Sequence, residues 1–239
     1  MLGMRNGGGL AGALALAVAC AAARADALPL RNPQVVFATA PLQSFMYSLG
    51  TGVNVATQQL DAPVWGAITN GAVCEDDLVK LDGHVAGTEI GVYSASDTAA
   101  APALLPLFAA SAGPGWFCSC QLCPYGKLVT YVFNDAAELI SINSYTGLDR
   151  EHYGFYLRHD GDVVYSQDAR NGGAPQVLAF AGNACDTWVC FEAAPYQGGA
   201  SRFLDGILEI VQDETTEGPW PCPTPVRRST WGSLKAAYR

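Results

Sequence analysis

Short runs in which apolar and polar residues alternate recur along the middle of this 239-residue chain. Period-two alternation predicts strands with one buried face, and the clearest example is Lys127–Phe133. Turn residues such as Asn171-Gly172-Gly173 separate the runs at intervals of roughly 8–12 residues, which predicts an all-β antiparallel sandwich or jelly roll. Further strands are expected at 35–37, 53–55, 65–68, 89–93, 153–157, 163–166 and 177–180, and a short helix is expected at 42–49. Three segments are less distinct: 78–85 is ambiguous, 103–108 is apolar, and 135–140 is a helical turn or irregular.

The last two alternating runs, Trp188–Glu192 and Phe203–Val211, flank a loop that contains Gly198-Gly199 and predict a β-hairpin. Glu192 enters this loop and Asp205 leaves it. Carboxylates that converge across a Gly-rich loop are typical Ca²⁺ ligands, so these two residues are candidate metal ligands. The alternative is that they cap the turn or that one of them pairs with Arg202.

The N-terminus has the pattern of a secretory signal peptide at 1–25: Arg5, an uncharged run over 10–23 that is too short to span a bilayer, and small-residue cleavage sites. A competing interpretation is lipidation of Cys20. The mature chain then comprises a β-sandwich domain at 26–211, a Pro-rich linker at 212–226 and a short basic tail at 227–239. The expected location is secreted or at the cell surface.

Charge is distributed unevenly. All 22 acidic residues lie between Asp26 and Glu217, where there are only 7 of the 13 basic residues. An acidic body disfavours nucleic acid and anionic membranes as partners and favours cations, although it also serves solubility alone. No segment after the signal peptide is long and apolar enough for a transmembrane helix.

Seven cysteines remain after the signal peptide, and in an exported protein they are disulfide candidates: Cys74, Cys118, Cys120, Cys123, Cys185, Cys190 and Cys222. Because seven is odd, at least one thiol is left over. The cluster Cys118–Cys123 also permits a metal site or a thiol redox site, but it lacks a second Cys-x-x-Cys arm and a nearby His.

The order of motifs carries a resemblance to a family: Tyr153–Leu157, Val164–Asp168, Asn171-Gly172-Gly173, and then Phe191-Glu192 to Asp205. This order resembles the domain of unknown function 4114 family and its relatives among exosortase-sorted (PEP-CTERM) bacterial surface proteins. The resemblance implies an extracellular β-sandwich that is suspected of binding Ca²⁺ and has no established catalysis.

The chain departs from the signature of that family inside the closing loop. Ala193, Ala200 and Arg202 stand where the family has Asp, and Leu204 stands where it has Asn. Only Glu192, Asp205 and loop carbonyls are left for the six to eight oxygen ligands of Ca²⁺, so any binding should be weak.

The leading hypothesis is therefore a non-catalytic extracellular module for structural or adhesive interaction with an unknown protein or glycan. The chain has no Gly-x-Ser-x-Gly or His-Glu-x-x-His motif, and its three histidines are His84, His152 and His159. An exported hydrolase or thiol redox protein is the less favoured alternative. A carbohydrate-binding module is the second hypothesis, with Trp65, Trp116, Tyr125 and Tyr196 as candidate aromatic contacts.

Overall fold

The computed structural model describes residues 29–61, 64–66, 74–182 and 186–212. The expected signal peptide and basic tail, and all of the expected linker after Gln212, lie outside the described residues. The elements are α1 (Thr39–Ser48), β1 (Glu75–His84), β2 (Glu89–Ser94), β3 (Leu105–Phe108), β4 (Phe117–Cys123), η1 (Pro124–Gly126), β5 (Lys127–Phe133), β6 (Leu139–Tyr145), β7 (Tyr153–His159), β8 (Asp162–Tyr165), η2 (Asp168–Asn171), β9 (Val177–Ala181), β10 (Asp186–Phe191), η3 (Gly198–Ala200) and β11 (Gly206–Gln212).

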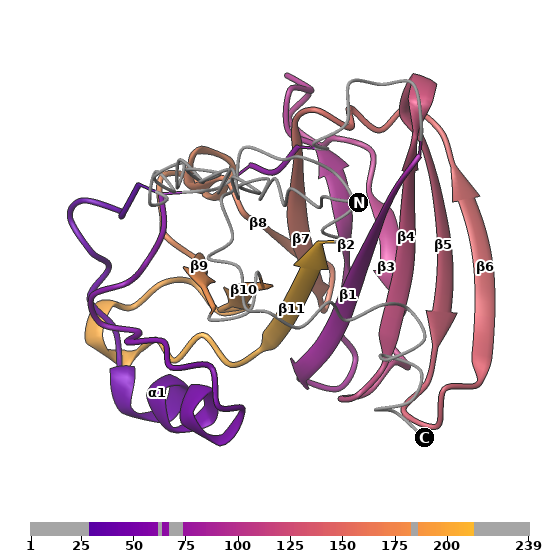
Figure 1. Cartoon of the computed structure of the whole chain (residues 1–239). Helices are drawn as coiled ribbons and strands as arrows, with labels where there is room; N and C mark the ends of the chain where they lie inside the picture. The colour runs from indigo at the N-terminus through magenta and orange to yellow at the C-terminus, as the bar shows by residue number, and fades with distance from the viewer. Residues whose placement is uncertain (1–28, 62–63, 67–73, 183–185, 213–239) are drawn as a thin grey trace, which may run out of the picture.

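The strands form two antiparallel sheets, which confirms the predicted all-β sandwich (Figure 1). The larger sheet has seven strands in the order β6-β5-β4-β1-β11-β10-β9, and the smaller has four in the order β3-β2-β7-β8. The predicted hairpin is the β10–β11 pair, in which Phe191 lies opposite Gly206. Within the described residues, no helix is long and apolar enough to cross a membrane.

The main hydrophobic core lies between the two sheets. Inward side chains of the larger sheet, such as Leu81, Val189 and Leu208, belong to the same buried cluster as Ile90 and Phe155 of the smaller sheet. Alternate residues of a strand point to opposite faces, so one face of each strand supplies this core.

A second buried cluster covers the other face of the β9–β11 end of the larger sheet. Leu42 and Met46 of α1 pack there with Trp188 and Ile207 (Figure 1). The helix predicted at 42–49 begins three residues earlier, at Thr39, and ends at Ser48 with Leu49 as its C-cap. Gly50 follows the cap, and its φ of +72° lies in the left-handed region that glycine adopts without strain.

The strands predicted at 35–37 and 53–55 are absent. At each place a glutamine side chain, rather than a neighbouring strand, forms hydrogen bonds with the backbone. The buried amide of Gln59 bonds both backbone groups of Val35, accepting from its N–H at 2.7 Å and donating to its C=O at 3.0 Å. Gln43 donates to the Val53 carbonyl at 2.7 Å and accepts from the Val55 N–H at 3.0 Å. The predictions for 35–37 and 53–55 were wrong because alternation reports a buried face, whereas a strand also needs a backbone partner.

Other boundaries shifted. Of the predicted strand at 65–68, Trp65 forms an isolated antiparallel bridge to Tyr153, while residues 67 and 68 lie outside the described residues. The ambiguous 78–85 segment belongs to β1, and β6 begins at Leu139, within the segment expected to be irregular. The cysteine-rich 117–123 segment forms β4, which composition alone did not indicate.

Candidate ligand-binding pocket

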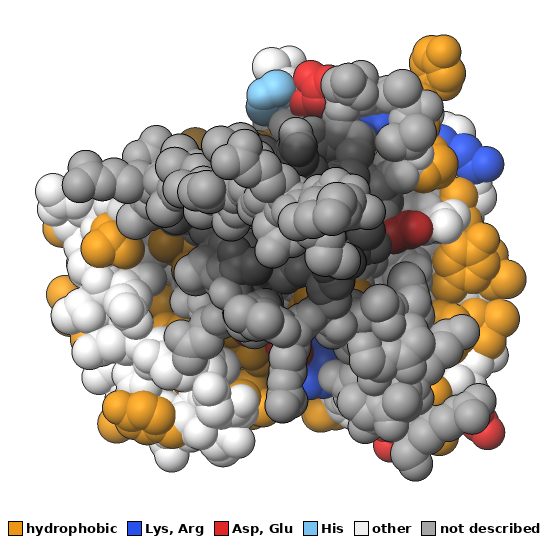
Figure 2. Space-filling model, viewed as in Figure 1, with side chains coloured by type: hydrophobic (Ala, Val, Ile, Leu, Met, Phe, Trp, Pro, Cys, Tyr) orange, Lys and Arg blue, Asp and Glu red, His pale blue; other side chains and the backbone are white. Residues whose placement is uncertain are grey.

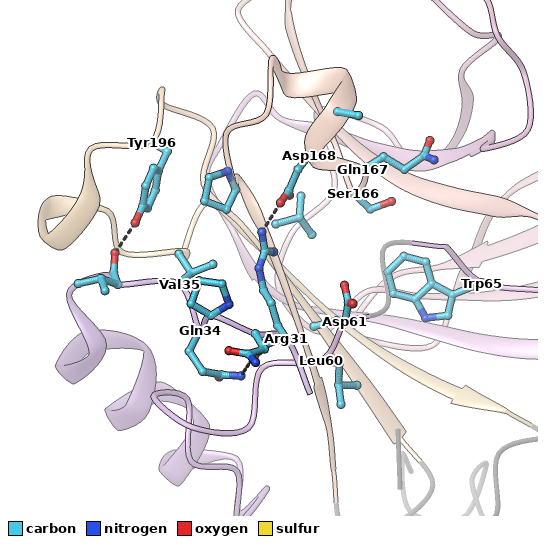
Figure 3. Close-up of a pocket in the computed structure, with 17 residues that line it drawn as sticks. Arg31, Gln34, Val35, Leu60, Asp61, Trp65, Ser166, Gln167, Asp168 and Tyr196 are labelled. Carbon is cyan, nitrogen blue, oxygen red and sulfur yellow. Dashed lines mark hydrogen bonds and ion pairs between the residues drawn. The ribbon is translucent and has the colours of Figure 1, made fainter. Parts of the chain in front are cut away.

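A pocket of about 650 Å³ opens beside β9, the edge of the larger sheet that lies farthest from β6. Segments distant in sequence form its walls: residues 31–36, then Leu60, Asp61 and Trp65, the turn after β8, and Tyr196 from the loop after β10 (Figure 3). Val177 and Ala179 of β9 add apolar surface. The volume lies within the range of small-molecule sites.

An ion pair spans the middle of the pocket. The Arg31 guanidinium donates to the Asp168 carboxylate at the start of η2, and both side chains are partly exposed (Figure 3). The backbone of Arg31 is itself fixed, because its N–H donates to the Gln59 carbonyl at 2.8 Å. Two planar charged groups therefore face the pocket in a set orientation and still present hydrogen-bonding atoms to it.

Two of the four candidate aromatic residues line this same pocket. Trp65 and Tyr196 lie at opposite ends of it in Figure 3, with the Arg31–Asp168 pair between them. Trp65 is only 5% exposed and packs edge-on against Phe155 at 4.9 Å, so it forms a wall. Tyr196 is more accessible and is oriented by its hydroxyl, which donates to the Val36 carbonyl at 2.6 Å.

The other two aromatic candidates lie elsewhere. Trp116 packs against the main core, and Tyr125 is fully exposed at the β4–β5 turn with a φ of +62°. The aromatic residues therefore do not form a single exposed row.

A network of polar side chains and aromatic rings stabilises the turn after β8. Arg170 donates to the Gln167 side chain at 2.9 Å and lies over the rings of Tyr93 and Tyr165. The Tyr93 hydroxyl donates to the same Gln167 oxygen at 3.1 Å, and burial raises the pKa of this tyrosine. The network fixes the Ser166–Asp168 side of the pocket before any ligand arrives.

The sequence-predicted metal ligands lie at the Gly-rich loop, as expected, and each bonds backbone amides. Glu192 accepts from the N–H groups of Arg202 at 2.6 Å and Phe203 at 2.8 Å, while Asp205 accepts from that of Ala193 at 2.7 Å. These contacts are those of the turn-capping alternative. No group of three or more His, Cys, Asp or Glu residues suited to a metal is present among the described residues, and Ca²⁺ binding at Glu192 and Asp205 stays a prediction.

Glu192 also supports a strained residue. Phe203 has a φ of +55°, is fully buried, and packs edge-on against Phe37 at 5.1 Å. A non-glycine residue in this region is costly unless its surroundings hold it there, and Glu192 binds its N–H.

We expect Glu192→Ala to lower the free energy of unfolding by about 2 kcal/mol, because two backbone donors lose a charged acceptor. Glu192→Gln keeps an acceptor oxygen and should have about half that effect. Chemical denaturation measures both values. Glu151→Ala, at an exposed position, is the control, and an equal loss in it would contradict the capping role.

The disulfide prediction holds for one pair, Cys74–Cys123. Cys118, Cys120 and Cys190 are buried free thiols in this structure, contrary to the expectation for them. The reason is strand geometry: these residues point from β4 and β10 into buried clusters, where Cys packs as a small apolar residue. Cys185 and Cys222 lie outside the described residues.

Two of the free thiols, Cys120 and Cys190, have pKa values raised above that of an ordinary thiol. The sulfur atoms of Cys118 and Cys120 are 3.1 Å apart, and this contact together with burial raises the pKa of Cys120. Burial also raises the pKa of the Cys190 thiol. Since the thiolate is the reactive form, none of these features favours the redox alternative.

The three histidines are dispersed. His84 bonds the Thr88 carbonyl at 2.8 Å, His152 lies 3.6 Å from Asp149, and His159 lies 3.4 Å from Asp160 at the β7–β8 turn. None of them lines the pocket.

Comparisons with known proteins add little. No protein-family model matches this chain, and no curated protein matches it. Among solved structures, sheep galectin-11 in complex with glycerol aligns with 63% of this chain and 89% of that chain, at 12% identity and a TM-score of 0.16. A TM-score this low establishes neither a common fold nor a common ligand, and the resemblance to the domain of unknown function 4114 family stays a prediction.

Sequence reasoning therefore found two residues of the pocket, Trp65 and Tyr196, and missed Arg31 and Asp168. These last two are 137 residues apart in the chain. No local spacing signal joins them, and only the packing of the N-terminal segment beside β9 brings them together.

Proposed function

We propose that this protein is an exported, non-catalytic β-sandwich module that binds carbohydrate in the pocket beside β9 and acts in cell-surface or matrix adhesion. The observation that carries the proposal is the arrangement of the pocket: aromatic residues at its two ends and a planar ion pair between them.

Carbohydrates fit this chemistry for two reasons. Their hydroxyl groups both donate and accept hydrogen bonds, which suits Arg31, Asp168 and nearby amides such as Gln34 and Gln167. Their C–H faces are apolar and pack against aromatic rings, a role open to Tyr196. Export is an expectation from the N-terminal sequence pattern, and it supplies the setting in which glycans are met.

The charge of the pocket narrows the ligand class. Arg31 and Asp168 neutralise each other, and the exposed carboxylate of Asp61 leaves the lining with an excess negative charge. An anionic sugar would be repelled by that charge, so the proposal specifies neutral oligosaccharides.

We expect the mature chain to bind neutral oligosaccharides on a glycan array and to show no binding to sialylated and uronic-acid glycans. Asp168→Ala should weaken binding of the best neutral glycan by about 10- to 100-fold in calorimetry, since it removes a charged hydrogen-bonding group from the pocket. Tyr125→Ala changes an exposed aromatic residue outside the pocket and should bind as the wild type does.

Two results would contradict the proposal. One is an array on which no neutral glycan binds the folded protein. The other is a glycan that binds equally well to Asp168→Ala and to the wild type, or that is lost in Tyr125→Ala instead, because binding would then lie outside this pocket.

A further inference from the structure

The edges of the two sheets are protected very unequally. An edge strand presents unpaired backbone N–H and C=O groups, which are a template for pairing with another strand, and proteins normally shield them. Among the described residues, three of the four sheet edges are shielded, and no described segment shields the fourth, β6.

The shielding of the other three edges is visible in the contacts. At β9, Gln59 forms an antiparallel bridge to Phe180, and the Leu60 N–H donates to the Ala179 carbonyl at 2.8 Å. At β8, the Asn171 side chain bonds both the N–H and the C=O of Tyr165, at 2.9 and 2.7 Å. The third edge, β3, has only four residues, and one of them is Pro106.

The β6 edge has none of these protective features among the described residues. It runs for seven residues, Leu-Ile-Ser-Ile-Asn-Ser-Tyr, without a proline or a charged side chain. On its outer side, no strand of the described residues pairs with it. Leu139 and Ile142 are 50% and 58% exposed, and Ile140, in the bulge, is 49% exposed.

The apolar surface continues inward from this edge. Ile142 pairs with Tyr131 and Leu139 pairs with Phe133, which stacks on Phe117 at 4.9 Å. Leu128, Thr130 and Val132 of β5 are buried, so these aromatic residues lie on the outer face of the sheet. Figure 2 shows hydrophobic side chains gathered on the side of the molecule where Figure 1 places β6.

We propose that β6 pairs antiparallel with β6 of a second copy of this chain, which joins the two seven-stranded sheets across a two-fold axis close to Ile142. An antiparallel pair of identical strands is self-complementary, as a two-fold interface requires. The whole chain has a net charge of −9, which opposes self-association, but β6 itself is uncharged and brings no like charges together.

The size of the contact sets its strength. Stable interfaces use about 20–30 residues on each side, whereas this edge offers seven strand residues and a few aromatic neighbours. We therefore expect a reversible dimer with a dissociation constant of roughly 10–100 µM.

Dimerisation through β6 has a consequence for binding. The pocket lies at β9, and β6 is the other end of the same sheet, so the two pockets of a dimer would face outward at its far ends. Two sites on one particle would cross-link a multivalent surface with higher avidity than a monomer. The dimer itself requires no ligand, so its test is independent of the proposed function.

The test is sedimentation velocity of the full mature chain from about 1 to about 300 µM, a range that brackets the expected dissociation constant. The wild type should shift from monomer to dimer. Ile142→Lys places two ammonium groups beside each other at the two-fold axis and should weaken the dimer at least tenfold. Tyr47→Lys changes another exposed apolar side chain, on α1 and away from β6, and should dimerise as the wild type does.

Each remaining outcome decides against the proposal. A wild type that stays monomeric throughout the range overturns it, as does an Ile142→Lys variant that dimerises normally. A chain truncated after Gln212 is the further control. If only the truncated chain dimerises, residues 213–239 of the same chain shield β6, and a second copy is not its occupant.

Discussion

Replacing both Cys74 and Cys123 by serine is expected to lower the free energy of unfolding by about 4 kcal/mol. The bond joins residues 49 apart in sequence. On the chain-entropy account, a cross-link that closes a loop of about 50 residues removes about this much unfolded-state freedom. The bond also clamps the first pair of the β1–β4 ladder, Glu75 opposite Leu122, close to the centre of the larger sheet.

Urea unfolding with and without a reductant measures this effect. The wild type should lose most of the difference when dithiothreitol is added, whereas the double serine variant should be insensitive to it. Cys118, Cys120 and Cys190 remain in both proteins, so a reductant effect that persists in the variant would show that a different disulfide provides the stability.

Gly91→Ala is expected to cost about 3 kcal/mol of stability, at the upper end of ordinary overpacking in a core. Gly91 lies at the register shift between β2 and β3. A Cβ there would lie 2.2 Å from the Leu105 carbonyl oxygen and 2.8 Å from both the Pro106 Cα and the Tyr156 ring. The first two are backbone atoms and cannot move aside as the end of a side chain can.

Thermal and chemical denaturation of Gly91→Ala and Gly199→Ala provide the comparison. Gly199 has open space where a Cβ would stand, so alanine there should change stability by less than about 0.5 kcal/mol. Equal stabilities for the two variants would mean that β3 does not press against β2 as closely as the structure shows.

The strand that the sequence predicted most closely buries a single face against the core. Lys127–Phe133 alternates along its whole length and is β5 residue for residue. Predictions failed where a segment alternates in sequence but its backbone does not pair with another strand. Val35 and Val53 bury apolar side chains in the second cluster, but glutamine side chains bond the backbones there. A side chain that substitutes for a strand leaves no periodic signal in the sequence.

The candidate site divides in a similar way. Trp65 and Tyr196 could be nominated from residue type, since aromatic residues commonly line binding sites. Arg31 and Asp168 could not be paired in advance, because their proximity depends on where the N-terminal segment crosses β9. Glu192 and Asp205 were correctly placed at one loop, but sequence could not choose between capping and metal binding, since both use the same oxygens.

The sequence by itself determined the fold class, the closing hairpin and the acidic character of the chain, because these follow from local alternation, turn residues and composition. The tertiary structure alone decided which cysteines bond, which carboxylate meets Arg31, and which strands lie at the edges of the two sheets. The physical reason is that these features depend on strand order and on contacts between residues far apart in the chain. A residue's type limits what it can bind, but packing determines which partner comes within reach.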